Sequence, residues 1–208
     1  MHNLIIVIPS YNEKKLLYLI KKLKKKQILI IDDGSKIKIN TQIKETNKLR
    51  IIRNKKNKGY EYSLLKALKL AANNSRYILT MDADGEHLCS NINKFYIYAR
   101  NNKVDLLIGS RSRLKRLSEK LLSLLFSMRY NIKDPLSGFK IYDSAKLKKM
   151  IYRNKFKEDF LIDLIKNFIV NKFIVKNYNI KSSKNNLRRS SLSNFKTTFK
   201  ILALVKYL

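Results

Sequence analysis

The stretch Tyr77-Ile-Leu-Thr-Met-Asp-Ala-Asp84 decides the predicted fold, because a strand-length apolar run ends abruptly at two carboxylates. A short, mostly apolar run such as 77–81 is typical of a strand covered on both faces of a sheet. Asp82 and Asp84 follow it with one residue between them. The stretch therefore predicts a buried strand with a pair of acidic side chains at its carboxyl end.

Strands and helices alternate on both sides of this stretch. Further apolar runs of strand length are residues 4–8, 28–31, 49–52 and 104–108. Apolar residues at helical spacing mark 13–26, 59–72 and about 91–101, and amphipathic helices follow from about 114, interrupted at 134–139. Residues 173–178 are predicted as a late edge strand. This order predicts an α/β fold, a mostly parallel sheet with helices on both faces.

Polar clusters follow four of the predicted strands. They are Ser10-Tyr-Asn-Glu13, Asp32-Asp-Gly-Ser35, Asp82-Ala-Asp84 and Gly109-Ser-Arg111. The carboxyl ends of parallel strands meet at one edge of the sheet, and ligands bind there. The four clusters therefore predict a single binding site.

The residue types at this edge suit a phosphorylated ligand and a metal. Asp82 and Asp84, with Glu86 as a further acidic group, offer the oxygen ligands that Mg²⁺ or Mn²⁺ prefers. Arg111 is suited to a forked contact with phosphate. Each motif also has a purely structural alternative, an acidic turn or a helix cap.

The second pair of carboxylates and the first cluster suit a nucleoside. Asp32 and Asp33 can accept hydrogen bonds from a nucleobase or from ribose hydroxyls, and Tyr11 offers a surface on which a base can stack.

The charge of the chain is strongly positive. Its 208 residues hold 46 Lys and Arg against 15 Asp and Glu, a formal net charge of +31. Such a field attracts nucleic acid, phospholipid headgroups or phosphorylated substrates. The chain is also rich in Asn and Ile, as expected of AT-biased coding, so charge alone does not decide the function. Nucleic acid is not expected as a partner, because no known binding motif is present and the acidic clusters would be left unexplained.

Compartment signals are few. Cys89 is the single cysteine, which favours a reducing compartment. The chain contains no run of about 20 apolar residues, the length that a membrane-spanning helix needs. The sequence therefore predicts a cytoplasmic protein or one bound to the cytoplasmic face of a membrane.

Five motifs together resemble those of a known family. They are Ile6-Val-Ile-Pro-Ser-Tyr-Asn-Glu13, Ile31-Asp-Asp-Gly-Ser35, Met81-Asp-Ala-Asp-Gly-Glu-His87, Gly109-Ser-Arg111 and Asp134-Pro-Leu-Ser-Gly-Phe-Lys140. In this order they resemble the inverting family 2 glycosyltransferases of GT-A fold, and within them the dolichyl- or polyprenyl-phosphate mannose and glucose synthases. The resemblance covers about the first 145 residues.

The resemblance implies site roles for an enzyme that uses a GDP- or UDP-hexose. The residues implied to line the nucleoside pocket are Pro9, Tyr11, Glu13, Ile31 and Asp33, with Asp32 beside them. The residues implied to hold metal, diphosphate and sugar are Asp82, Ala83 and Asp84, with Arg111 on the phosphates. Ser137, Gly138 and Phe139 are implied to shape the acceptor side.

The chain departs from the family pattern at two places. Glu86 stands where the family often has Gln. The later basic pattern of the family is not reproduced, and Arg188 and Arg189 are the nearest candidates for additional phosphate contacts.

Two acceptor classes stay open at this point. A hydroxyl acceptor, such as a sugar of a cell-surface glycan, needs a general base, for which Asp159 is the candidate. A polyprenyl phosphate is already anionic and needs no base.

The end of the chain favours the lipid. We predict a catalytic domain over 1–180 and a basic amphipathic tail over 181–208, whose apolar face holds Leu192, Phe195, Phe199, Leu202 and Val205. Such a tail suits an anionic membrane surface, or equally the protein's own core.

Overall fold

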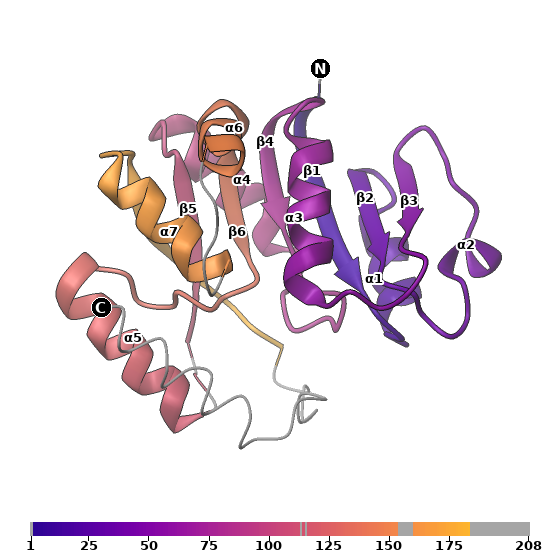
Figure 1. The fold of residues 1–208 in the computed structure, drawn as a ribbon, viewed down its shortest axis with the longest axis horizontal. Coiled ribbons are helices and arrows are strands. Elements are labelled where there is room, and N and C mark those ends of the chain that lie inside the picture. Colours follow the sequence, from indigo (N-terminus) through magenta and orange to yellow (C-terminus); the bar gives the residue numbers. More distant parts are fainter. Residues whose placement is uncertain (1, 113, 115, 154–159, 184–208) are drawn as a thin grey trace.

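The computed structural model describes residues 2–112, 114, 116–153 and 160–183. Its centre is a seven-stranded sheet in the order β3-β2-β1-β4-β6-β5-β7 (Figure 1). The strands are β1 His2–Ser10, β2 Gln27–Asp32, β3 Leu49–Arg53, β4 Ser75–Thr80, β5 Leu106–Arg111, β6 Lys140–Asp143 and β7 Val175–Ile180. Strand β6 runs antiparallel to both β4 and β5, and the other neighbouring pairs are parallel.

Helices cover both faces of the sheet. They are α1 Leu16–Leu23, α2 Ile39–Gln42, α3 Tyr60–Ala71, α4 Asn91–Asn101, α5 Leu117–Tyr130, α6 Ser144–Arg153 and α7 Phe160–Val170. The core beneath α3, α5, α6 and α7 forms one apolar cluster, and the core beneath α1 and α4 forms a second. Strand β1 contributes residues to both clusters: Ile6 and Ile8 lie in the second cluster and Val7 lies in the first, because successive side chains of a strand point to opposite faces. The predicted α/β fold is therefore confirmed.

The structure refines several predicted bounds. The predicted edge strand is β7, which lies at the end of the sheet beside β5. The first helix is shorter than the predicted 13–26, since α1 begins only at Leu16 and ends at Leu23. Asn12, which precedes it, takes a left-handed conformation with a φ of 52°. Strand β5 begins at Leu106, two residues later than predicted, and its end carries Arg111.

Strand β6 was not predicted. It has only four residues, Lys-Ile-Tyr-Asp, all buried, and such a run carries too few residues for a periodic signal. It is inserted between β4 and β5, so these two consecutive parallel strands are not neighbours in the sheet.

The helices of the described residues include none that is both long and apolar enough to cross a membrane. The predicted tail begins at 181, so all but its first three residues lie outside the described ranges, and the domain boundary stays a prediction.

Candidate active site

The four polar clusters meet at one edge of the sheet, as predicted. Ser10 at the end of β1 is paired in register with Asp32 at the end of β2, and the Asp33 N–H donates to the Ser10 carbonyl over 2.9 Å. Asp82 follows β4, and Arg111 ends β5. Because β6 is antiparallel, it begins at this same edge and brings Gly138 against Asp82.

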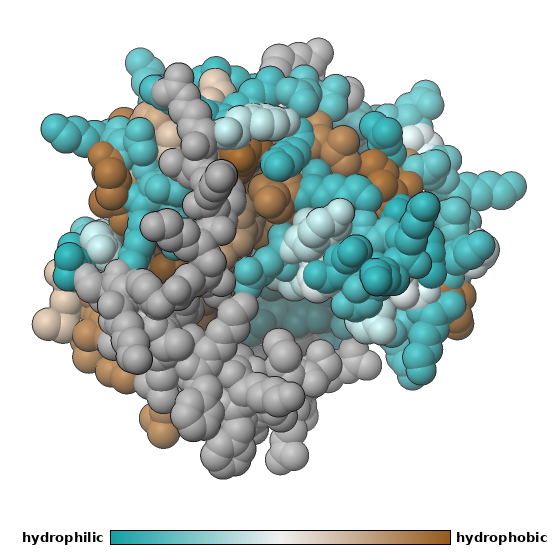
Figure 2. Space-filling view, in the orientation of Figure 1, coloured by the Kyte–Doolittle hydropathy of each residue, from teal (hydrophilic) through white to brown (hydrophobic). Residues whose placement is uncertain are grey.

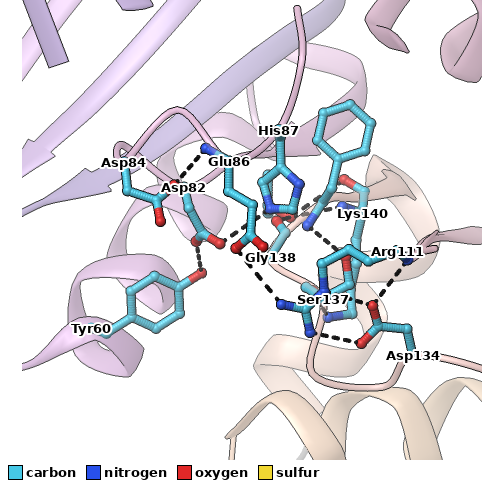
Figure 3. A network of polar contacts seen from close by, with 12 residues as sticks. Tyr60, Asp82, Asp84, Glu86, His87, Arg111, Asp134, Ser137, Gly138 and Lys140 are labelled. Carbon is cyan, nitrogen blue, oxygen red and sulfur yellow. Dashed lines mark hydrogen bonds and ion pairs between the residues drawn. The ribbon is translucent and has the colours of Figure 1, made fainter. Parts of the chain in front are cut away.

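The carboxylate of Asp82 is held from two sides (Figure 3). The Tyr60 hydroxyl, on the first residue of α3, donates to Oδ1 over 2.9 Å, and Nε2 of His87 lies 3.2 Å from Oδ2. The side chain of Asp82 is still 30% exposed. Burial opposes its ionised form, but the contacts with His87 and Tyr60 and the charge of Arg111 lower its pKa below the ordinary 3.8. Asp82 is therefore an oriented, ionised carboxylate at the end of a buried strand.

The Tyr60 hydroxyl is the complementary half of this contact. Although the residue as a whole is 39% exposed, desolvation of the hydroxyl, together with the charge of Asp82 and the hydrogen bond to it, raises the pKa of Tyr60 well above its ordinary value. Tyr60 therefore stays protonated and keeps donating to Asp82 throughout the neutral pH range. No sequence pattern indicated Tyr60, which follows Gly59 at the start of a predicted helix.

Asp84 carries an unfavourable negative charge. Its Oδ1 accepts a hydrogen bond from the Glu86 N–H over 2.8 Å. Burial and the nearby charges of Asp82 and Glu86 raise its pKa above the ordinary value. A cation beside Asp84 would relieve both costs.

The donor set fits a hard divalent cation. Asp82 and Asp84 project from one short loop and offer carboxylate oxygens, the ligands that Mg²⁺ and Mn²⁺ take. Within the described residues, no three His, Cys, Asp or Glu side chains are grouped as a complete metal site. Mg²⁺ is commonly bound by one or two carboxylates with substrate phosphates and water. The site fits a metal of that kind better than a closed protein cage.

Arg111 makes a forked contact, but its partner is Asp134 and not the predicted phosphate. Its Nε and one terminal nitrogen donate to Asp134 over 2.8 and 3.1 Å, and its backbone N–H donates to the same carboxylate. Glu86 and Glu119 lie 3.8 and 4.0 Å from the guanidinium. Burial opposes the charge of Arg111, but the contacts with Asp134 and the charges of Glu119 and Glu86 raise its pKa. Its contact with donor phosphate stays a prediction.

Glu86 is directed toward Arg111 in this structure (Figure 3). Its carboxylate makes an ion pair of 3.8 Å with the guanidinium. Its predicted role as a third metal ligand is not tested, and the role would require it to turn from this ion pair toward Asp84.

Asp32 and Asp33 anchor loops. Asp32 accepts from the N–H groups of Ser35 and Ile39 and pairs with Arg53. Although burial opposes ionisation, these contacts lower the pKa of Asp32. Both Asp32 and Asp33 are buried, with exposures of 1% and 3%.

Asp33 binds the segment that leads into α3. Its carboxylate accepts from the side chain of Asn54 over 2.8 Å, and from the N–H groups of Lys58 and Gly59 over 3.0 and 2.8 Å. It thereby fixes the approach to Tyr60. The structure shows loop-anchoring contacts for both carboxylates, and their contact with a nucleoside stays a prediction.

The other residues predicted at the nucleoside differ in accessibility. Pro9 and Ile31 are buried within the sheet, whereas Tyr11 is 49% exposed. Glu13 lines a cavity of about 340 Å³ between the start of α1 and residues 35–42. Asn12, Glu13 and Ser35 of the first two polar clusters line this cavity, whereas Asp82, Asp84 and Arg111 do not, so the cavity lies beside the loop of Asp82 and Asp84.

The acceptor-side residues are packed against the metal loop. Ser137 and Gly138 are buried, and Oγ of Ser137 accepts from the Phe139 N–H over 3.2 Å. The buried ammonium of Lys140 donates to the Ser137 carbonyl. Ala83 is also buried, with an exposure of 6%. Asp159, Arg188 and Arg189 lie outside the described residues.

Gly138 permits the close approach of β6 to Asp82. A methyl group added at this position would overlap the carboxylate of Asp82, which cannot swing away freely because Tyr60 and His87 hold it. We expect Gly138→Ala to lower activity at least about tenfold, because it would displace the carboxylate of Asp82 by about an ångström. The effect on the free energy of unfolding should be smaller than the effect on activity. Steady-state rates and urea unfolding of the variant test this. Full activity of Gly138→Ala would contradict the expectation.

Comparison of the sequence with known proteins identifies its family. Residues 5–129 match the model of the family described as glycosyl transferase family 2. An uncharacterised protein of Methanocaldococcus jannaschii is 28% identical over 184 residues, which cover 77% of this chain and 80% of that protein. A second uncharacterised protein of the same organism is also 28% identical, over 70% of this chain and 67% of that protein.

Solved structures share the fold. Glucosyl-3-phosphoglycerate synthase from Mycobacterium tuberculosis, in complex with Mn²⁺, UDP and phosphoglyceric acid, has a TM-score of 0.74 at 13% identity, covering 99% of this chain and 78% of that chain. S. aureus TarS in complex with UDP-GlcNAc has a TM-score of 0.65 at 17% identity, covering 99% and 66%. The family model spans more than half of the chain and includes the loop of Asp82 and Asp84. The chain therefore belongs to glycosyl transferase family 2.

Proposed function

We propose that this glycosyltransferase moves a hexosyl group from a GDP- or UDP-hexose to a polyprenyl phosphate, with inversion and with Mg²⁺ or Mn²⁺. The observation that carries the proposal is the geometry of Asp82 and Asp84. Asp82 is ionised and oriented by Tyr60 and His87, and Asp84 beside it carries a charge that a cation would relieve. A divalent cation held there supplies Lewis-acid stabilisation of the diphosphate leaving group.

The protein's own groups position the donor around that pair. Gly138, just before β6, leaves room for the carboxylate of Asp82. Arg111 adds a fixed positive charge 3.8 Å from the carboxylate of Glu86. A fixed charge of this kind stabilises negative charge that develops in the transition state without reorganising. The solved structures of similar fold, one with Mn²⁺ and UDP and one with UDP-GlcNAc, support a nucleotide-sugar donor and a metal.

A phosphate acceptor suits this chain on chemical grounds. The phosphate oxygen is already anionic, so its attack on the sugar needs no general base, and a net charge of +31 attracts such an acceptor. A lipid-linked phosphate would place the enzyme on the cytoplasmic face of a membrane. The second candidate is a hydroxyl acceptor, such as a cell-surface glycan, and it is favoured by the phosphoglyceric acid complex of the M. tuberculosis relative.

Transfer assays with the full chain test the proposal. UDP- and GDP-hexoses are supplied with Mn²⁺ or with EDTA, and each is offered a short-chain polyprenyl phosphate, phosphoglyceric acid or a glycan. We expect a glycosylated lipid phosphate that forms only with the divalent metal present. Transfer that is undiminished in EDTA would overturn the proposed role of the metal. Transfer to a hydroxyl acceptor alone would overturn the proposal that the acceptor is a polyprenyl phosphate.

A further inference from the structure

Helix α5 carries an apolar stripe on its outer side. Leu117, Leu121, Leu124 and Met128 are 83, 41, 57 and 76% exposed. Their spacing of four, three and four residues places them on one helical face. Such exposures are unusual for large apolar side chains repeated along one helix, because solvated helices carry polar residues on that face.

The opposite side of α5 packs on the protein. Leu122 and Phe126 are fully buried in the core cluster beneath α3, α6 and α7. The inner face therefore holds the helix on the core, and the residues of the outer stripe belong to neither apolar cluster. Figure 1 shows α5 at the margin of the molecule, and Figure 2 shows apolar side chains at the surface in that region.

The remaining exposed residues of α5 are cationic. Lys120 and Arg129 are the two other exposed side chains on the helix, and Lys133 is exposed just beyond it. The one acidic residue of α5, Glu119, is 14% exposed and pairs with Arg111 and Arg116 on the inner side. Within the described residues, the exposed side chains of α5 are therefore apolar or positively charged, and none of them is acidic.

From this combination we propose that α5 docks the protein on an anionic lipid bilayer, with its leucines and Met128 in the headgroup boundary and Lys120 and Arg129 on lipid phosphates. An apolar stripe flanked by Lys and Arg is what an interfacial helix needs. A second copy of the chain fits the stripe less well. Each copy carries a net charge of +31, and a symmetric contact would bring these cations together.

Docking through α5 would also orient the site. Glu119, on the inner side of the same helix, lies 4.0 Å from Arg111, so the helix connects the membrane-facing surface with the phosphate end of the site. The inference about α5 does not rest on the proposed sugar chemistry, because vesicle binding is measured without substrate. It would explain how the enzyme reaches an acceptor that is anchored in lipid.

Vesicle cosedimentation of the full chain tests the inference. Vesicles of phosphatidylcholine alone are compared with vesicles that also contain phosphatidylglycerol, at low and high salt. The test variant carries Leu121→Gln and Leu124→Gln, both on exposed positions, so circular dichroism should show an unchanged fold. We expect it to bind the anionic vesicles about 30-fold more weakly, and Lys120→Gln about fivefold more weakly.

Two further variants distinguish vesicle binding through α5 from binding through other surfaces of the protein. Ile97→Gln with Val170→Gln removes apolar residues that are 47 and 77% exposed on other helices, and it should bind like the unmodified chain. Phe195→Gln with Phe199→Gln tests the predicted tail. Unchanged vesicle binding by the α5 variant, or loss of binding only in the tail variant, would overturn the inference. A dimer that dissociates in the α5 variant, without any vesicle binding, would assign the stripe to a second copy and overturn it as well.

The same α5 variant separates this inference from the proposed function. Transfer to a short, water-soluble polyprenyl phosphate does not require docking and should persist in the variant. Absent transfer by the unmodified chain, with vesicle binding intact, would instead count against the proposed function alone.

Discussion

Replacing Asp84 with asparagine is expected to lower the rate of sugar transfer by about 100-fold or more, because a carboxylate that helps to hold the metal contributes several kcal/mol to the stability of the transition state. Asn keeps the size of the side chain and its oxygen for the 2.8 Å contact with the Glu86 N–H. It removes the negative charge that we propose to hold the cation. The variant therefore isolates charge from shape.

The same substitution should not destabilise the protein. The pKa of Asp84 is raised in the folded state, mainly by burial and then by Asp82 and Glu86. The ionised group consequently costs stability once the pH exceeds its ordinary value of 3.8, and the neutral amide avoids this cost. At neutral pH, urea unfolding should give an equal or larger free energy of unfolding.

Three measurements check the Asp84 prediction together: the rate of transfer at saturating donor, urea unfolding, and Mn²⁺ titration by calorimetry. Asp105→Asn is the control, since Asp105 precedes β5 at the opposite edge of the sheet and accepts from the Ile174 N–H. An Asp84→Asn variant with an unchanged rate would remove the basis of the metal role.

The sheet could be predicted from sequence where its strands are long apolar runs. Strands such as β1 and β2 are buried on both faces, so their composition alone identifies them. Strand β6 escaped prediction because its four residues include Lys140 and Asp143, charged types that are rarely buried. Its antiparallel insertion depends on tertiary pairing with β4 and β5, which no local pattern encodes.

The site could be predicted at the level of its strand ends and not of its contacts. Parallel strands bring their ends together whatever the side chains do, so Asp82 and Arg111 were found from their positions. The partners of these two residues come from distant segments: Tyr60 from the start of α3 and Asp134 from the loop after α5. Asp134 lies within a motif that resembles one of the family's. The spacing of that motif does not indicate that the carboxylate of Asp134 accepts two hydrogen bonds from the guanidinium of Arg111.

Replacing Asp134 with alanine is expected to lower the free energy of unfolding by about 3 kcal/mol or more, the usual cost of removing one partner of a buried ion pair. The side chains of Arg111 and Asp134 are 12 and 3% exposed. The variant would leave a buried guanidinium and an Arg111 N–H without their acceptor. Glu86 and Glu119, at 3.8 and 4.0 Å, compensate only in part because neither makes a forked contact.

An ion pair with one solvated partner provides the control. Arg76 pairs with Asp143 over 2.9 Å, and the side chains are 59 and 6% exposed. Asp143 also accepts from the N–H groups of Ala145 and Lys146, which remain when Arg76 is removed. Arg76→Ala should therefore cost only about 1 kcal/mol. Urea unfolding of both variants measures the difference, and equal costs would show that burial does not strengthen the Arg111 pair.

A double-mutant cycle then separates the pair from the burial of its members. Arg111→Met removes the charge that Asp134→Ala leaves unpaired, so the double variant should be more stable than the sum of the two single effects predicts. Transfer activity should stay low in all three variants, because each loses the guanidinium or its orientation toward the site. If the two effects on stability were instead additive, the fork would contribute little, and the orientation of Arg111 would have to come from Glu86 and Glu119. The cycle thereby decides whether the site charge is fixed by Asp134 or by the two glutamates around it.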